Sequence, residues 1–290
     1  MIYRRYKKMK KIVNLDGIEV GYGKRVPIIA EIGVNHLGSL DRAKLMVDMA
    51  NNGGADFIKF QTYEAERRYD LIKNPKAKEF IGLTKQWQLS KDQEIELWDY
   101  ARTKKAKVFT SVYDQETVNF AEELKNPIYK IAAFEITNKD LINRIIKTRK
   151  PVIISCGMTN VQEIKKLIKP FEENKIDYIL LHTVSSYPLQ KVHSNLKKIY
   201  ELSENFKCPI GHSDHTPGSE IPPYAVCAGA HIIEKHFTDN PKHRLSDNFF
   251  SITENDLKVI RFNIDQVSTF IHSPDFNNND PEKFMRSFRK

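Results

Sequence analysis

Short apolar runs alternate with longer amphipathic segments along most of the chain. Eight of the apolar runs have the length of strands, and they cover residues 26–30, 57–60, 108–110, 128–131, 152–154, 178–181, 209–210 and 232–233. These runs are apolar at consecutive positions, so both faces of each strand are expected to be buried. Strands that are buried on both faces and separated by helical segments are typical of a parallel sheet covered by helices.

The segments between these runs contain apolar residues at helical spacing. After the first run, Leu40, Ala43, Met46 and Ala50 fall on one face, and Ser39 precedes them as a candidate N-cap. Further helices are predicted over residues 90–104, 115–124, 160–171 and 254–270, and residues 62–89 form a long insertion. Eight strand repeats predict an α/β fold closed as a (β/α)₈ TIM barrel. The main alternative is a doubly wound open sheet, but the chain has no GxGxxG phosphate turn to support it.

Two regions are predicted to lie outside the barrel. Residues 1–25 form an N-terminal extension and a β-hairpin around Asp16-Gly17, which is expected to plug the bottom of the barrel. Residues 26–272 form the barrel domain itself. Residues 273–290, which contain the run NNNDP at 277–281, are predicted to be a flexible tail.

The composition is compatible with one soluble barrel. The chain has 290 residues, whereas one α/β barrel takes roughly 250. No apolar stretch approaches the ~20 residues that cross a bilayer, and the basic N-terminus has no apolar segment behind it, so neither a membrane span nor a signal peptide is expected. The cysteines Cys156, Cys208 and Cys227 are widely spaced and odd in number, which fits a reducing cytoplasm better than a disulfide framework.

The formal net charge of +9 raises the question of nucleic-acid binding. The basic residues are dispersed over the predicted helices and both ends of the chain, with no basic stripe interleaved with aromatic residues, so no nucleic-acid partner is expected. A solvated, lysine-rich surface explains most of the charge, and a basic protein also attracts anionic substrates.

Polar and charged residues follow the apolar runs, where the loops of a barrel enzyme converge on its active site. They are Glu31, Lys59, Gln61, Ser111, Lys130, Glu135, Ser155, His182, Ser185, Ser213, Asp214, His215, Glu234, Lys235 and His236. Any one of them could be a satisfied structural ion pair, because charged residues are rarely buried without partners. Eight strands that end in this way favour a shared active site instead.

The residue types indicate particular chemistry. Two ammonium groups, Lys59 and Lys130, together with the hydroxyls of Ser155, Ser185 and Ser213, would form a cradle for a phosphate. His215 and His236, on consecutive strands, could present two imidazoles to Mn, Zn or Fe, or could merely be hydrogen-bonded at the rim. Glu31 and Glu135 are candidates for general acid–base work, or for holding a water and an aldehyde oxygen.

Six segments resemble the motifs of the sialic acid synthase family, in the same order. They are IAEIGVNHLGS at 29–39, IKFQT at 58–62, YKI at 129–131, SCGM at 155–158, GHSDHT at 211–216 and EKHF at 234–237. The resemblance implies a synthase that condenses phosphoenolpyruvate with an N-acetylated hexosamine (ManNAc-like) into a nonulosonic acid and phosphate. It also implies a divalent metal on His215 and His236, with Mn²⁺ expected and Mg²⁺ or Co²⁺ as alternatives.

The resemblance assigns further roles residue by residue. Phosphoenolpyruvate is expected to contact Lys59, Ser111, Lys130, Ser155, Ser185 and Ser213. The amino sugar is expected to contact Gln61, Tyr187, Glu234 and Asp247, while Glu31 and Glu135 match the two glutamates of the family. The sequence departs from the family at Ala133, Ser185, Leu245-Ser246 and 248–250, all near the expected substrates, so the acceptor stays open.

Members of this family usually continue into a small antifreeze-like domain that reaches across a homodimer. Since the sequence ends at Lys290, the resemblance covers the barrel only, and a homodimer or a separate antifreeze-like partner protein is expected. Three alternatives remain. The chain could be a barrel synthase for another aldose, akin to the 3-deoxy-sugar-acid phosphate synthases, a Schiff-base aldolase using Lys59 or Lys130, or a partner subunit without activity of its own.

Overall fold

The computed structural model describes residues 11–69, 71, 75–271 and 282–289. Eight parallel strands close into a barrel in the order β10-β3-β4-β5-β6-β7-β8-β9. These strands are β3 (Ile28–Gly33), β4 (Phe57–Gln61), β5 (Val108–Ser111), β6 (Tyr129–Ile131), β7 (Val152–Ser155), β8 (Tyr178–Thr183), β9 (Ile210–Asp214) and β10 (Ile233–His236). The predicted TIM barrel is therefore confirmed, and the open sheet is excluded because β10 pairs with β3.

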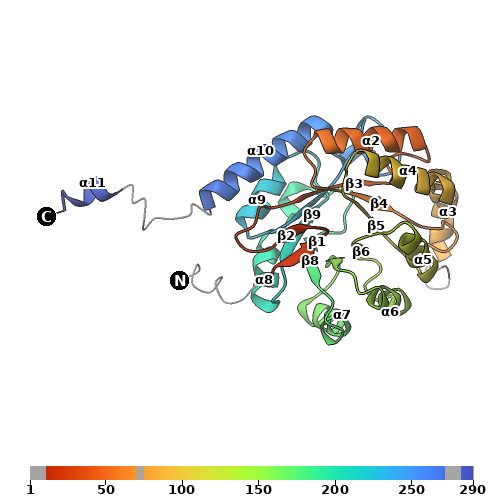
Figure 1. Ribbon diagram of the computed structural model, residues 1–290, viewed down its shortest axis with the longest axis horizontal. Coiled ribbons are helices and arrows are strands. Elements are labelled where there is room, and N and C mark those ends of the chain that lie inside the picture. Colours follow the sequence, from red (N-terminus) through yellow and green to blue (C-terminus); the bar gives the residue numbers. More distant parts are fainter. Residues whose placement is uncertain (1–10, 70, 72–74, 272–281, 290) are drawn as a thin grey trace.

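Helices surround the barrel (Figure 1). They are α2 (Leu40–Asn52), α3 (Lys78–Trp87), α4 (Lys91–Thr103), α5 (Gln115–Glu123), α6 (Lys139–Lys147), α7 (Val161–Glu173), α8 (Lys197–Asn205), α9 (Ile221–Cys227) and α10 (Glu254–Ile271). The described residues also form the short helix α11 (Lys283–Arg286) and the 3₁₀ turns η1 (Pro75–Ala77), η2 (Lys191–His193) and η3 (Asn248–Phe250). Ser39 caps α2 as expected, since its side chain accepts from the amide of Arg42. Ser90 and Asn160 begin α4 and α7 with complete capping boxes.

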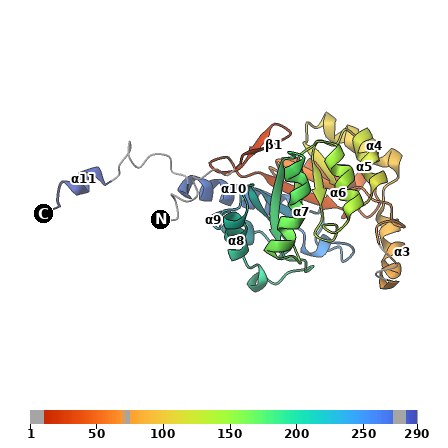
Figure 2. The same cartoon turned by 90° about the horizontal axis from the view of Figure 1, so that it is seen from below.

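The hairpin of β1 (Val13–Leu15) and β2 (Ile18–Val20) closes the amino-terminal end of the barrel, as predicted. Val13, Leu15 and Val20 are fully buried, and they pack against apolar side chains from the strands. Those partners are Ile29, Phe57, Phe109, Ile128, Ile153, Ile179, Leu181 and Ile232. Figure 2 shows β1 on one side of the barrel.

Strand alternation places the polar residues in the same lumen. Side chains repeat on one face every second residue, so Glu31 follows Ile29, Lys59 follows Phe57, and Ser111 follows Phe109. The lumen is thus apolar at the amino-terminal ends of the strands and charged at their carboxyl ends. The candidate site lies at the carboxyl ends because the polar half of each strand faces inward there.

In two of the strands, most residues lie beyond the predicted apolar run. The apolar residues at 209–210 and 232–233 marked only the beginnings of β9 and β10, which continue to Asp214 and His236. The polar residues of both strands are nevertheless buried. The helices α6, α8 and α9 were not predicted, although α6 buries Leu141, Ile142, Ile145 and Ile146 on one face.

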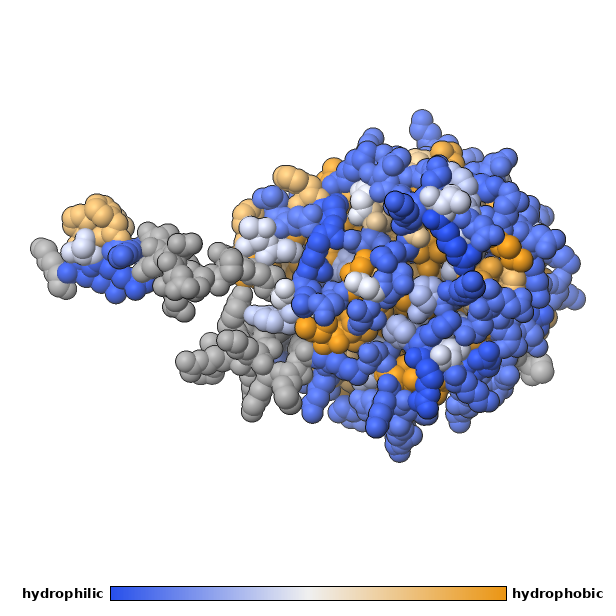
Figure 3. Space-filling model, in the orientation of Figure 1, coloured by the Kyte–Doolittle hydropathy of each residue, from blue (hydrophilic) through white to orange (hydrophobic). Residues whose placement is uncertain are grey.

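The surface in Figure 3 is mostly hydrophilic, with scattered apolar patches. No helix in the described part of the chain has both the length and the apolar composition that a membrane span requires. Most of the predicted flexible tail and the first ten residues lie outside the described residues. The described part of the tail contains α11.

Candidate active site

A cavity of about 670 Å³ opens at the carboxyl ends of the strands. It is lined by thirteen predicted site residues, namely Glu31, Lys59, Gln61, Ser111, Lys130, Glu135, Ser155, Tyr187, Ser213, His215, Glu234, His236 and Asp247. Ser185 is the one predicted contact that does not line the cavity. Its hydroxyl is buried without a hydrogen-bond partner and faces Gly157, where an added Cβ would come within 2.5 Å of it.

Two lysines and two glutamates form a buried network at the bottom of the cavity. Nζ of Lys59 lies 3.1 Å from Glu31 Oε2 and 3.3 Å from Glu234 Oε2. Nζ of Lys130 lies 3.0 Å from Glu234 Oε1. The hydroxyl of Ser213 donates to the same oxygen at 2.8 Å, and Nζ of Lys59 donates to Ser111 Oγ at 3.2 Å. Glu234, expected at the sugar, therefore holds the two lysines together.

The network carries an excess of positive charge near neutral pH. Burial raises the pKa of Glu31 to about 7, against the opposing effect of Lys59, so this carboxyl is only partly ionised. Burial acts on Glu234 in the same sense, but Lys130 and Lys59 outweigh it and lower the pKa of Glu234. Burial lowers the pKa of Lys130 to about 8, which still leaves it charged at neutral pH. Two cations face fewer than two full negative charges, which favours an anionic ligand.

His215 and His236 lie side by side above this network. Their ring centroids are 5.4 Å apart, and Tyr187 packs on His215 with ring centroids 4.2 Å apart. Nδ1–H of His215 donates to the carbonyl of Val184 at 2.8 Å, so the lone pair of this imidazole is on Nε2. Burial lowers the pKa of His215 to about 4 and that of His236 well below its usual value. Both imidazoles are therefore neutral, as metal ligands must be.

The two imidazoles fit an open metal site better than a closed one. Nδ1 of His236 is buried without a hydrogen-bond partner, 3.4 Å from Asp247 Oδ2. Within the described residues, no three His, Cys, Asp or Glu side chains converge as a closed metal site requires. A metal held here would have two protein nitrogens and would leave coordination positions for water or substrate.

The mouth of the cavity has a second polar group around Gln61. The Gln61 side-chain amide donates to Glu31 Oε1 at 2.7 Å, while its carbonyl oxygen accepts from Arg68 and from the hydroxyl of Tyr113. Burial raises the pKa of Asp247 to about 6 and also raises that of Glu135. Gly33, with φ of +55°, allows this packing, because a Cβ there would lie 2.9 Å from both Gln61 and Glu31.

Sequence reasoning missed several residues of the cavity. Arg68, Tyr69 and Phe80 come from the insertion at 62–89, where the sequence has no periodicity that fixes a side chain's direction. Tyr113 and Thr183 could have been predicted from strand alternation. Tyr113 lies two residues after Ser111, and Thr183 lies two residues after Leu181, and both Ser111 and Leu181 face the lumen. His182, one of the polar residues that follow the apolar runs, does not line the cavity and stacks on His212.

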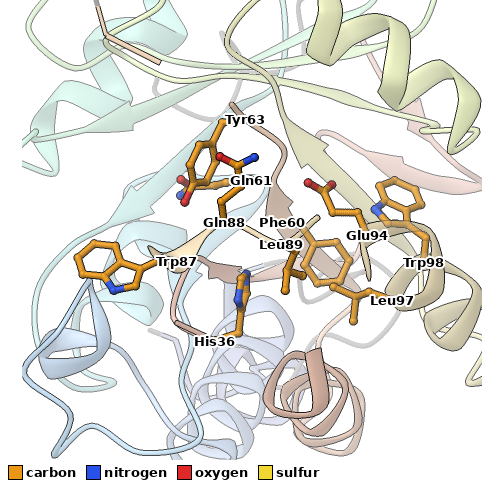
Figure 4. Close-up of a pocket in the computed structure, with 10 residues that line it drawn as sticks. All are labelled: His36, Phe60, Gln61, Tyr63, Trp87, Gln88, Leu89, Glu94, Leu97 and Trp98. Atoms are coloured by element: carbon orange, nitrogen blue, oxygen red, sulfur yellow. The ribbon is translucent and has the colours of Figure 1, made fainter. Parts of the chain in front are cut away.

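A second, much smaller cavity of about 10 Å³ lies between β4 and α4 (Figure 4). Glu94 is buried there and accepts a 2.7 Å hydrogen bond from Thr62, while the indole N–H of Trp98 has no partner. His36 also lines this cavity, and its Nδ1 accepts a hydrogen bond from the amide of Gly38. Burial raises the pKa of Glu94 to about 8, so the carboxyl is largely protonated at neutral pH.

Glu94→Gln is expected to make the protein more stable than the wild type in mild alkali. The folded-state pKa of Glu94 lies above the unfolded value, so stability is full below about pH 4.5 and is lost as pH rises towards 8. Each unit of this shift corresponds to about 1.4 kcal/mol, so the variant should gain a few kcal/mol at pH 8.5 and little at pH 5. Urea unfolding at both pH values measures this difference. A constant difference between the two proteins would contradict a buried neutral carboxyl.

The fold and the cavity together define a barrel enzyme whose cavity contains two lysines beside two histidines. The sequence model of the NeuB family matches residues 46–274. The chain is 33% identical over 256 residues to an N,N'-diacetyllegionaminic acid synthase of Campylobacter jejuni, covering 84% of this chain and 77% of the relative. It is also 33% identical over 259 residues to the N-acetylneuraminate-9-phosphate synthase of Homo sapiens, covering 85% and 71%.

A solved structure gives the same result. An N-acetylneuraminic acid synthetase from Leptospira borgpetersenii, in complex with citrate, matches with a TM-score of 0.91 at 32% identity, and the match covers 98% of both chains. The chain belongs to the NeuB family. The resemblance that the sequence motifs indicated is thereby confirmed.

Proposed function

We propose that this protein condenses phosphoenolpyruvate with an N-acylated hexosamine of the N-acetylmannosamine type, giving a sialic-type nonulosonic acid and phosphate. The observation that carries this proposal is the convergence of Lys59 and Lys130 with the two imidazoles on one cavity. Two cations beside serine hydroxyls suit a phosphoryl group. The relatives named as legionaminate and neuraminate 9-phosphate synthases support the same class of substrate.

The donor half of the cavity is built for phosphoenolpyruvate. Lys59 and Lys130 supply the charge, and Ser111, Ser155 and Ser213 supply hydroxyl donors around them. Because Glu234 holds both ammonium groups, their positions are set before the substrate arrives.

The reaction needs one new carbon–carbon bond and one water. C3 of phosphoenolpyruvate bonds to the aldehyde carbon of the open-chain sugar, and the aldehyde oxygen takes up a proton. Water adds to C2 and loses a proton, after which the bond between C2 and the phosphate oxygen breaks, C2 becomes a ketone and phosphate leaves. Glu31 is suited to move these protons because its pKa of about 7 lies near neutral pH. Glu135, which also lines the cavity, is proposed as the second acid–base group.

A divalent metal, with Mn²⁺ as the first choice and Mg²⁺ or Co²⁺ as alternatives, fits the pair of imidazoles. A metal bound here supplies Lewis-acid polarisation of the acceptor's aldehyde oxygen. His215 is oriented for this role by its hydrogen bond to Val184 and by the ring of Tyr187. Asp247 lies next to His236 and is proposed to face the sugar together with Gln61 and Tyr187.

Phosphate release tests this function. Purified protein with phosphoenolpyruvate, N-acetylmannosamine and Mn²⁺ should release phosphate and form a product with the mass of the two substrates plus water minus phosphoric acid. Omission of either the sugar or the metal should abolish the release. Release that does not depend on any hexosamine in a panel of N-acylated sugars would contradict the proposal.

The pKa of Lys130 predicts an alkaline limit for donor binding. Lys130 is cationic below about pH 8 and loses its charge above it, so kcat/KM for phosphoenolpyruvate should fall by up to tenfold per pH unit above pH 8. Lys130→Arg keeps a cation at this position at higher pH. The fall in kcat/KM should therefore begin more than one pH unit higher in this variant. Steady-state kinetics from pH 6.5 to 9.5 measures both profiles. A flat wild-type profile up to pH 9.5 would exclude Lys130 as a donor ligand.

The same lowered pKa of Lys130 favours a second candidate, a Schiff-base aldolase, since an imine requires a neutral amine. The ion pair with Glu234 at 3.0 Å opposes it, because it keeps the ammonium charged. Borohydride trapping with pyruvate distinguishes the two reactions. A stable adduct on Lys130 would support the aldolase.

Assembly and location complete the proposal. A homodimer, and activation by a separate antifreeze-like protein, are proposed from the family resemblance. Mass photometry tests the dimer, and a rise in turnover when such a protein is added tests the partner. The three cysteines are widely spaced and odd in number, which supports a reducing cytoplasm as the place of action.

A further inference from the structure

Arg68 occupies a rigid position at the mouth of the cavity. The carbon of its guanidinium lies 4.5 Å from the ring centroid of Tyr63, 4.7 Å from that of Tyr113 and 5.9 Å from that of Tyr69. Stacking of a guanidinium on aromatic rings fixes the plane of the group and the direction of its N–H bonds. The three tyrosines therefore hold Arg68 as a preformed donor.

Only part of this donor is used within the protein. Nη2 of Arg68 donates to Gln61 Oε1 at 3.0 Å. Nη1 is buried and has no hydrogen-bond partner, and no carboxylate in the described residues lies within ion-pair distance of the guanidinium. A buried, charged N–H without an acceptor is costly, and Arg68 lines the cavity. An acceptor atom that arrives with a substrate would remove this cost.

The surroundings of Arg68 select the kind of atom. Two carboxyl groups, those of Asp247 and Glu135, line the same cavity as Arg68. With two carboxyls around one cation, this half of the cavity has no surplus positive charge for a phosphate. Apolar side chains line the same cavity at Ala77, Phe80, Ala133 and Phe134. A neutral carbonyl oxygen attached to a small apolar group fits these surroundings.

We propose that Arg68 is a specificity-determining residue, whose Nη1 donates a hydrogen bond to the carbonyl oxygen of the acceptor's N-acyl group. The inference rests on the proposed function, because it assumes an amino-sugar acceptor. The amide carbonyl is the strongest neutral acceptor on such a sugar, and its methyl group would contact the apolar lining. Arg68 thus distinguishes an N-acylated hexosamine from a plain hexose.

The test compares two acceptors and two neighbouring arginines. Arg68→Gln should lower kcat/KM for N-acetylmannosamine about 100-fold, the size expected for one hydrogen bond to a charged donor. It should leave the KM for phosphoenolpyruvate within about twofold and should change kcat/KM for mannose little. Arg67→Gln is the matched control, since Arg67 is paired with Asp114 at 2.9 Å and does not line the cavity. Its kinetics should equal those of the wild type.

A third variant separates direct contact from an indirect effect through Gln61. Tyr113→Phe removes the other donor to Gln61 Oε1 but leaves Nη1 of Arg68 in place. It should lower turnover equally with both acceptors and keep the preference for the acylated sugar. Loss of that preference in Tyr113→Phe would assign the effect to Gln61 and overturn the inference, as would an unchanged preference in Arg68→Gln.

Calorimetric titration with N-acetylmannosamine separates this inference from the proposed function. If the wild type binds the sugar and Arg68→Gln does not, while neither turns over phosphoenolpyruvate, the inference stands and the proposed reaction falls. If the wild type turns over and Arg68→Gln retains the full preference, the reaction stands and the inference falls. If the wild type neither binds nor turns over the sugar, both fall.

Discussion

Glu31→Gln is expected to lower kcat by about 10² to 10⁴, the usual contribution of a general acid–base group. Glutamine has the same shape as glutamate and can still accept the hydrogen bond from Gln61, but it cannot exchange a proton. Lys59 keeps its second carboxylate, Glu234, at 3.3 Å, so the cation should stay in place. The KM for phosphoenolpyruvate should therefore not rise, and the loss should appear in kcat alone.

Steady-state kinetics with both substrates varied measures this separation, and circular dichroism confirms the fold of the variant. Glu116→Gln is the control, because Glu116 is exposed, does not line the cavity and contacts Arg67, which does not line it either. An increase in the KM for phosphoenolpyruvate without a fall in kcat would contradict the assignment. It would show that Glu31 serves to hold the donor.

Removal of the divalent metal is expected to lower kcat by about 10³ or more, because Lewis-acid polarisation contributes several kcal/mol to the stability of the transition state. With the two imidazoles as its proposed ligands, the metal should be removed readily by a chelator and should return on addition of Mn²⁺. His215→Asn and His236→Asn should not regain activity with Mn²⁺. His193→Asn, a change of an exposed histidine on η2, should regain it fully.

Electron paramagnetic resonance gives a readout that does not depend on activity. The fraction of bound Mn²⁺ should fall in both active-site variants and should match the wild type in the η2 variant. Full turnover in the presence of excess chelator would exclude a metal role. Tight Mn²⁺ binding by the double variant would place the metal elsewhere.

Much of the fold followed from apolar runs, and the exceptions have a physical cause. Runs such as 178–181 are strands because they pack on both faces, and that requirement is visible in the sequence. β9 is different, because Gly211, His212, Ser213 and Asp214 are buried by partners far along the chain. His212 stacks on His182, and Asp214 pairs with Lys235 at 2.6 Å. Tertiary contacts of this kind leave no apolar pattern to find.

The candidate site was predictable where strand alternation decides the direction of a side chain. In the segment from Glu234 to His236, the outer two residues face the cavity, and Lys235 faces away to meet Asp214. The pairing of Glu234 with both lysines was not predictable. It requires the closed barrel to bring side chains of β6 and β10, which are not neighbouring strands, into one lumen. Arg68 was not predictable either, since its position depends on Tyr63 and Tyr69 of its own insertion and on Tyr113, which follows β5.

Phosphorus NMR of phosphoenolpyruvate on the Mn²⁺-loaded protein probes the arrangement most directly. If the lysine pair and the imidazole pair serve one reaction, the paramagnetic ion should strongly accelerate the relaxation of the bound phosphorus. The acceleration should vanish when Mg²⁺ replaces Mn²⁺ and when His236 is changed to Asn. Bound phosphoenolpyruvate whose relaxation is the same with either metal would show that donor and metal do not meet in this cavity.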